Sequence, residues 1–276
     1  MKKPVASRAV VNLRRAYFEC RYGQLHVRTA FPSTGGFDER TPLLCLHAGP
    51  GSSRSFAAFL SAMATDRSVY AADMPGCGES DPPPAQPTVA DYAAAIGDFL
   101  GNLRLRHVDV LGYHEGAAIA AELAIGQPAL VRKLVFAGVP LYTRAEREAF
   151  TARPYPQPPT MDGSHWLAEW QRRLAGKGPG MSLEQLATGF ADTLHNGLNA
   201  GWPVRAAYAW AGHERLPLVA QPVLVLRPRD DLWEPTLRAE RLLGSAHWQD
   251  LGEFGAGLFE VAPEAVAARV RKFLDR

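Results

Sequence analysis

The sequence has 276 residues, of which 47% are hydrophobic and 21% charged, a composition that is ordinary for a globular protein. Its formal net charge of +2 is not gathered in a basic tract, which argues against nucleic acid and membrane surfaces as partners. Residues 1–15 carry positive charge without an apolar run behind them, so we expect neither a secretory signal nor, in any later stretch, a membrane span. The three cysteines lack metal-binding spacing, and we expect them to be free thiols of a cytoplasmic protein: Cys20, Cys45 and Cys77.

The predicted elements begin with a hairpin, because apolar and polar residues alternate on both sides of the turn at Tyr22-Gly23. Beyond it, short apolar runs alternate with helix-like segments. The expected strands are residues 43–46, 68–73, 107–113, 131–139, 222–227 and 247–251, and the expected helices are 55–64, 88–105, 116–125, 237–243 and 264–274. Capping boxes are expected at Thr88 with Asp91 and at Ser182 with Gln185. The alternation predicts a mostly parallel sheet covered by helices on both faces.

The middle of the chain, residues 141–217, breaks this alternation, because it holds helix-like segments and no strand pattern. We therefore predict a helical lid of residues 141–217, inserted after the sixth strand of an eight-stranded core. Residues 1–140 and 218–276 form that core. The aromatic residues of the insertion either line a pocket beneath the lid or form the insertion's own small core: Trp166, Trp170, Trp202, Tyr208 and Trp210.

A first candidate site is the segment Gly112-Tyr113-His114-Glu115-Gly116, which joins a predicted strand to a predicted helix. The two glycines permit a sharp turn that pushes the central side chain out above the sheet, where ligands of open α/β sheets bind. The central residue of such a turn has a positive φ angle, which histidine tolerates better than most residues. We therefore place His114 at the centre of the site. Glu115 is either a second acid/base group or only a favourable negative charge in the first turn of the helix.

A second candidate is the small-residue loop His47-Ala48-Gly49-Pro50-Gly51, which follows the strand at residues 43–46. Such a loop aims backbone N–H groups into the site. The amides of Gly49 and Glu115 are the natural pair for an oxyanion hole. For His47 we favour a structural role, in which hydrogen bonds from its ring hold the loop.

A third candidate is the segment Arg227-Pro228-Arg229-Asp230-Asp231, at the end of the strand at residues 222–227. A carboxylate at this point can orient an imidazole and stabilise its protonated form. Asp231 is our choice for that carboxylate, with Asp230 in reserve. The alternative, which we favour for Asp230, is a turn in which the side chains only accept hydrogen bonds from backbone donors.

Over nearly its whole length the chain resembles the α/β-hydrolase superfamily. The resemblance rests on five segments: HAGPGSSRSF, DMPGCGESDPP, GYHEG, PVLVLRPRDD and LFEVAPEAV. They are similar to the branch that has a lid and includes C–C bond hydrolases, proline iminopeptidases, epoxide hydrolases and haloalkane dehalogenases. The resemblance implies an eight-stranded, mostly parallel sheet flanked by helices, with the helical lid after the sixth strand.

Two departures from the family pattern concern its catalytic residues. The centre of the turn in the family is serine, aspartate or cysteine, whereas this chain has His114. The family's histidine normally follows the last strand, where this chain has Ala256, and His247 begins that strand at the wrong end of the sheet. We expect the His114 ring to fill the space left by the small Ala256 side chain and to form a dyad with Asp231. His114 then acts as the general base and Asp231 fixes its tautomer.

Further residues are expected around the substrate. Trp233 directly follows the candidate acid, and Ala256 leaves space beside His114. Within the predicted lid, His195 lies on the same helical face as Asp192 and is the histidine that we assign to the pocket. We therefore expect Trp233, Ala256 and His195 to line the substrate pocket.

Three functions stay open at this point. The leading hypothesis is an enzyme in which His114 activates water or abstracts a proton from a small, largely apolar substrate. Hydrolysis of an ester, lactone or C–C/acyl bond is then the default, by analogy of fold. The second is cofactor-free proton transfer of the decarboxylase, lyase or oxygenase type, and the third is a non-catalytic ligand-binding protein. With neither a metal-ligand cluster nor a nucleotide-binding loop in the sequence, we expect no metal and no cofactor, and a homodimer stays open.

Overall fold

A single sheet of eight strands organises the computed structural model, which describes residues 12–33, 39–152 and 155–276. Residues 1–11, which hold most of the start discussed above, lie outside these ranges. The order of the strands is β1-β2-β4-β3-β5-β6-β7-β8. Their bounds are β1 Arg14–Cys20, β2 Gly23–Ala30, β3 Leu43–Leu46, β4 Val69–Ala72, β5 Val108–Tyr113, β6 Val131–Ala137, β7 Val223–Pro228 and β8 His247–Leu251.

The pairing of the strands confirms the predicted mostly parallel sheet. The hairpin strand β2 pairs antiparallel with both β1 and β4, whereas every pair from β4 through β3, β5, β6 and β7 to β8 is parallel. All residues of β3, β4, β5 and β7 are buried, which explains their mostly apolar sequences. The two charged exceptions form ion pairs, Asp109 with Arg132 and Arg227 with Asp250. The carboxyl ends of the parallel strands therefore meet at one edge, where loops of the chain converge.

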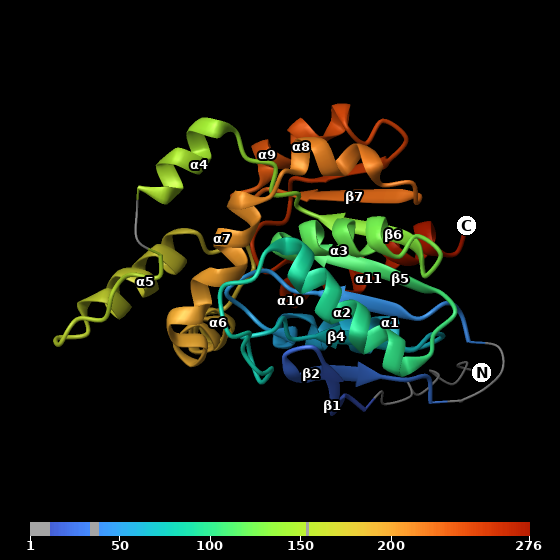
Figure 1. Ribbon diagram of the computed structural model, residues 1–276, viewed down its shortest axis with the longest axis horizontal. Coiled ribbons are helices and arrows are strands. Elements are labelled where there is room, and N and C mark those ends of the chain that lie inside the picture. Colours follow the sequence, from blue (N-terminus) through green and yellow to red (C-terminus); the bar gives the residue numbers. More distant parts are fainter. Residues whose placement is uncertain (1–11, 34–38, 153–154) are drawn as a thin grey trace, which may run out of the picture.

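Helices cover both faces of the sheet and produce two apolar cores (Figure 1). One face is covered by α2 and α3, which contact each other, and the other by α1 and α11. The helices outside the insertion are α1 Ala57–Met63, α2 Val89–Leu103, α3 Glu115–Gly126, α9 Trp233–Arg238, α10 Leu258–Val261 and α11 Pro263–Leu274. Both predicted capping boxes are confirmed, at Thr88 with Asp91 and at Ser182 with Gln185.

Between β6 and β7 the described residues form helices and contain no strand, so the insertion point is the predicted one. Its helices are α4 Arg144–Thr151, α5 Ser164–Ala175, α6 Leu183–Asn196, α7 Trp202–Ala209 and α8 Gly212–Arg215. Helix α7 packs against α2 and α3, whereas α4 and α5 extend away from the sheet in Figure 1. None of the helices in the described ranges is both long and apolar enough to cross a bilayer.

The aromatic residues of the insertion mostly pack on one another, which supports the second of the two alternatives above. Trp166 and Trp170 place their rings edge-on to Phe190, with centroid distances of 6.3 and 5.5 Å. Trp210 is buried and donates its indole N–H to Glu122 at 2.8 Å. Tyr208 is stacked between two parallel rings, at 3.8 Å from Tyr142 and 3.9 Å from Phe150. These contacts stabilise the insertion itself.

Candidate active site

The turn after β5 presents His114 as the sequence predicts. Its φ angle is +51°, in the region that non-glycine residues rarely adopt. A Cβ atom on Gly112 would lie 2.3 Å from the carbonyl oxygen of Gly116, and one on Gly116 would lie 2.2 Å from that of Leu46. Gly138, just beyond β6, makes room for the His114 ring, because a Cβ atom there would lie 2.7 Å from the ring carbon Cδ2. Close packing of backbone thus fixes the direction of the imidazole.

The carboxylate partner of His114 is Asp230, and the choice of Asp231 was wrong. Nε2 of His114 lies 2.8 Å from Oδ2 of Asp230, and the exposed fractions of the two side chains are 17% and 3%. Asp231 is exposed and points to a cavity instead. The two roles considered for Asp230 are compatible, because its other oxygen, Oδ1, accepts a hydrogen bond from the amide of Leu232 at 2.9 Å. The tight turn after β7 therefore directs the first aspartate inward.

The hydrogen bond to Asp230 sets the tautomer of the imidazole. A carboxylate only accepts, so Nε2 carries the hydrogen and Nδ1 is the basic atom of the neutral ring. In the described part of the chain, Nδ1 of His114 has no hydrogen-bond partner. Burial opposes the protonated ring, but the charges of Asp230, Glu115 and Asp231 and the bond to Asp230 outweigh it and raise the pKa of His114.

The predicted oxyanion hole is occupied by a side chain of the protein. The amide of Gly49 donates to Oε2 of Glu115 at 2.9 Å, and the carboxylate also accepts from the Glu115 amide. The two amides thus converge as predicted, but they bind the Glu115 carboxyl group. This group is only 6% exposed, and burial raises its pKa. Glu115 is therefore more than a charge at the start of a helix.

The loop that carries Gly49 is held by His47, as the sequence favoured. The fully buried ring donates from Nδ1 to the carbonyl of Ala48 at 2.9 Å and accepts at Nε2 from the amide of Met74 at 2.9 Å. Because both nitrogens are engaged, His47 has no free atom for chemistry. Its role is to position the loop.

A cavity of about 510 Å³ opens next to these groups. Gly49, Tyr113, Asp231 and Ala256 line it on the side of the sheet, whereas His114, Glu115 and Asp230 lie behind this lining. The insertion closes the other side, where Gly178 packs so tightly that a Cβ atom on it would lie 2.2 Å from the carbonyl oxygen of Ala256.

The lining of this cavity is more polar than the expected apolar pocket. It includes four cationic and three acidic side chains: Arg54, Arg172, Arg173, Lys177, Asp192, Asp231 and Glu260. Burial and the nearby Asp192 raise the pKa of Glu260 to about 7. Asp192 is only 3% exposed and accepts from Ser52 at 2.7 Å and from Arg54 at 2.9 Å. The cavity is thus suited to a substrate with polar groups.

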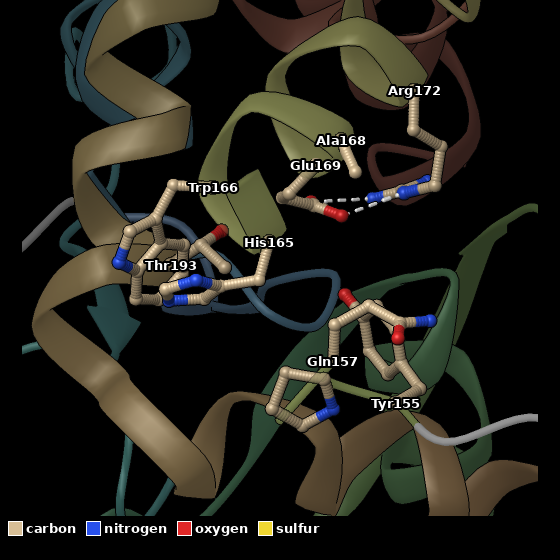
Figure 2. A pocket seen from close by; sticks show the side chains of 9 residues that line it. Tyr155, Gln157, His165, Trp166, Ala168, Glu169, Arg172 and Thr193 are labelled. Atoms are coloured by element: carbon tan, nitrogen blue, oxygen red, sulfur yellow. Dashed lines mark hydrogen bonds and ion pairs between the residues drawn. The ribbon is translucent and has the colours of Figure 1, made fainter. Parts of the chain in front are cut away.

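A smaller cavity of about 200 Å³ lies within the insertion (Figure 2). The ion pair of Arg172 with Glu169 faces Tyr155 across it, and the guanidinium carbon lies 5.9 Å from the centroid of the tyrosine ring. His165 also lines it, and its Nδ1 accepts from the amide of Thr160 at 3.1 Å. Arg172 lines both cavities and therefore separates the smaller one from the cavity beside His114.

Two of the predicted pocket residues lie elsewhere. Trp233 stacks on the guanidinium of Arg227, 3.9 Å from its ring centroid, and lines neither cavity. His195 is exposed on α6, because the turn of the helix that buries Asp192 leaves it facing solvent. Helical spacing placed Asp192 and His195 on one face of the helix, but it could not decide which of them faces inward.

Sequence reasoning missed the charged residues that the insertion contributes to the cavity. Arg172 and Arg173 lie on α5, whose alternation of charged and apolar residues resembles that of any surface helix. Glu260 lies within the segment LFEVAPEAV that supported the family resemblance, but nothing in that segment indicated a buried carboxyl group. Within residues 12–33, 39–152 and 155–276, no group of three or more His, Cys, Asp or Glu side chains is arranged to hold a metal ion.

The strand order and the turn after β5 are those of the α/β-hydrolase fold, and the comparisons with known proteins agree. The model of the alpha/beta hydrolase fold family matches residues 41–155. Proline iminopeptidase of Heyndrickxia coagulans is 34% identical over 105 residues, which make up 36% of each chain. Putative carbamate hydrolase RutD of Rhizobium rhizogenes is 27% identical over 253 residues, or 84% of this chain and 92% of that protein.

Solved structures of low sequence identity share the whole fold. The enol-lactonase from Burkholderia xenovorans matches with a TM-score of 0.76 at 16% identity, over 95% of this chain and 100% of its own. The esterase EaEST from Exiguobacterium antarcticum matches with a TM-score of 0.75 at 17% identity, over 95% and 100%. The chain therefore has the α/β-hydrolase fold, with residues 41–155 matching the family model, and the relatives and neighbours named here are hydrolytic enzymes by their names.

Proposed function

We propose that this protein hydrolyses an ester, lactone or related acyl bond of a small molecule, with His114 as the general base. The observation that carries this proposal is the 2.8 Å contact between Nε2 of His114 and Oδ2 of Asp230, which leaves Nδ1 of the same ring free. A positioned imidazole with one engaged and one basic nitrogen is the arrangement that general base catalysis needs. The hydrolytic relatives of the chain support the reaction class.

The base would act on water, because the turn after β5 carries no hydroxyl or thiol nucleophile at His114. Nδ1 of His114 takes a proton from a water molecule as the water oxygen bonds to the acyl carbon. The imidazolium, stabilised by Asp230, then gives that proton to the leaving group. Asp230 holds the ring in one orientation and one tautomer throughout.

The substrate would enter the cavity of about 510 Å³ beneath the insertion, which we assign the role of a lid. Its lining of arginine, lysine and carboxyl side chains favours a small acyl compound with polar substituents over a purely apolar one. The free thiols, with Cys45 and Cys77 buried, are compatible with the cytoplasm as the site of action.

A panel of small esters, lactones and β-diketones, offered to the wild type, His114→Ala and His195→Ala, tests the proposal. His195 is an exposed histidine that lines neither cavity and serves as the matched control. We expect turnover by the wild type and by His195→Ala, and a loss of about 10²–10⁴-fold in His114→Ala. Full turnover by His114→Ala, or labelling of the wild type by a serine-directed phosphonate, would refute the assignment of the base.

A further inference from the structure

We propose that Glu115 is a catalytic acid, which donates a proton from its carboxyl group, seated on the amides of Gly49 and Glu115, to the substrate oxygen. This inference rests on the proposed function, because it assigns the acid that acts together with the His114 base. Glu115 thereby replaces the backbone oxyanion hole that the sequence predicts at the same point.

The carboxyl group of Glu115 occupies both amides of the expected oxyanion hole. In an oxyanion hole the backbone N–H groups face the place where negative charge develops on the substrate. Here the Gly49 amide already donates to Oε2 of Glu115 at 2.9 Å, and the Glu115 amide is engaged by the same carboxyl group. A substrate oxygen at this place therefore meets the carboxyl group and not the amides.

The surroundings of the Glu115 carboxyl group disfavour its ionised form. Its exposed fraction is 6%, and no lysine or arginine in the described ranges pairs with it. Burial disfavours the carboxylate and outweighs the opposing effects of His114 and the two backbone hydrogen bonds, so the pKa of Glu115 is raised towards the neutral acid, which has an O–H to donate. Of the titratable groups that interact with the Glu115 carboxyl group, only His114 can carry a positive charge. The others are acidic or neutral: Asp230, Tyr113, Tyr142, Tyr155, Tyr208 and Cys77.

The proposed acid, Glu115, lies next to the proposed base, His114. His114 and Glu115 are consecutive residues, and each influences the proton affinity of the other. The active form of the pair has a neutral imidazole and a neutral carboxylic acid. It holds the same number of protons as the imidazolium–carboxylate form, in which the charge of Glu115 raises the pKa of His114. Protonation of the His114 ring at Nδ1 disables the base, and ionisation of the Glu115 carboxyl group disables the acid.

The chemical step balances with these two groups. His114 Nδ1 takes a proton from water while the water oxygen bonds to the acyl carbon, and the carbonyl electron pair moves to oxygen as it takes the proton of Glu115. The new hydroxyl then returns its proton to Glu115 as the bond to the leaving group breaks. The leaving group takes the proton from the imidazolium, so both residues end as they began.

Replacement of Glu115 by glutamine tests the proposal, because the amide keeps the size of the side chain and its acceptor oxygen but cannot transfer the proton. We expect Glu115→Gln to fold like the wild type and to lose about 10²–10⁴-fold in kcat. Its pH–rate profile changes from a bell to a single rise with pH, set by His114. Glu184→Gln, an exposed carboxyl group on α6, is the control and keeps the bell. A wild-type kcat and an unchanged bell in Glu115→Gln would overturn the proposal.

Infrared spectroscopy separates failure of this inference from failure of the proposed function, because it needs no substrate. We expect the carbonyl band of a protonated carboxylic acid to persist at pH values where exposed carboxyl groups are ionised in Glu260→Gln, a background that removes the other carboxyl group of raised pKa near the site, and to be absent when Glu115→Gln is added. If the substrate panel fails but this band is seen, only the reaction class is wrong. If His114 proves essential for turnover but the band is missing, the acid role of Glu115 is refuted.

Discussion

The turn after β5 and the loop after β8 carry opposite departures from the α/β-hydrolase pattern. The first has the large imidazole of His114 in a backbone conformation with φ of +51°, packed against Gly138 and partly buried beside two carboxyl groups. The second has the small Ala256 between two glycines and carries no histidine. The family resemblance implies a contact between a histidine in the loop after β8 and the carboxylate after β7. Here His114 makes that contact from the turn after β5.

The two regions are in direct contact, so one can compensate for the other. The amide of Gly257 in the loop after β8 donates to the hydroxyl of Tyr113 at 3.3 Å, and the ring of Tyr113 lies 4.3 Å from that of His114. The difference between the two regions teaches that the position of the carboxylate, here Asp230, determines where an imidazole can act. Which loop carries the imidazole matters less. The predictions below test this contrast.

The largest effect is expected from the carboxylate. Asp230→Asn should lower kcat by about 10²–10⁴-fold, because the amide no longer fixes the tautomer of His114 or stabilises the imidazolium. Removal of the charge also lowers the pKa of His114, so the acidic limb of the pH–rate profile moves to lower pH. Asp231→Asn is the matched control and should change kcat by only a few fold. Equal losses in both variants would contradict the assignment of Asp230.

The next largest effect is expected on stability, at the glycine that makes room for the imidazole. Gly138→Ala should lower the free energy of unfolding by about 1–3 kcal/mol, because φ is +75° and the added Cβ atom meets the His114 ring. Urea unfolding measures it, and Gly252→Ala in the exposed loop after β8 serves as the control. If His114→Ala relieves most of the loss in the double variant, the ring is the group that clashes. An unaltered loss would assign the effect to the backbone alone.

A smaller and pH-dependent effect is expected at Glu260, in α10 after the loop of β8. Burial raises its pKa to about 7, so the folded protein binds this proton more tightly than the unfolded chain does. Stability from Glu260 is present at low pH and is lost as pH rises through about 7. Glu260→Gln should therefore be more stable than the wild type above that pH, by on the order of 1 kcal/mol, with the gain shrinking as pH falls and absent below the ordinary pKa of 4.5. A gain that does not depend on pH would contradict this origin.

The smallest effect is expected at Ala256 itself. The proposed chemistry needs no side chain there, and the residue lines the open cavity. Ala256→Ser should change kcat by less than about threefold and stability by no more than about 0.5 kcal/mol. Steady-state kinetics with the best substrate of the panel measures it. A loss comparable to that of Asp230→Asn would place an essential group in the loop after β8.

The sequence predicted correctly the sheet, the helical insertion between β6 and β7, and the position of His114 at the sharp turn, because each rests on a local physical pattern. Buried parallel strands need mostly apolar runs, and the sharp turn needs the glycines at 112 and 116. It also placed the Gly49 and Glu115 amides together, since both follow the ends of neighbouring strands, β3 and β5.

What the sequence did not predict depends on the direction of single side chains. One residue separates Asp230 from Asp231, and only the turn after β7 decides which of them faces His114. The Glu115 side chain folds back onto its own amide and that of Gly49, which no spacing reveals. Trp233 and His195 turn away from the cavity for the same reason.

The titration of the His114 ring by ¹⁵N NMR tests the central claim most directly, with the wild type and Asp230→Asn measured side by side. The account predicts a neutral ring that carries its hydrogen on Nε2, with Nδ1 bare, and a pKa of His114 that falls when Asp230 is replaced. A neutral ring with its hydrogen on Nδ1, or a pKa unchanged in Asp230→Asn, would contradict it. In that case His114 is not a base held by Asp230.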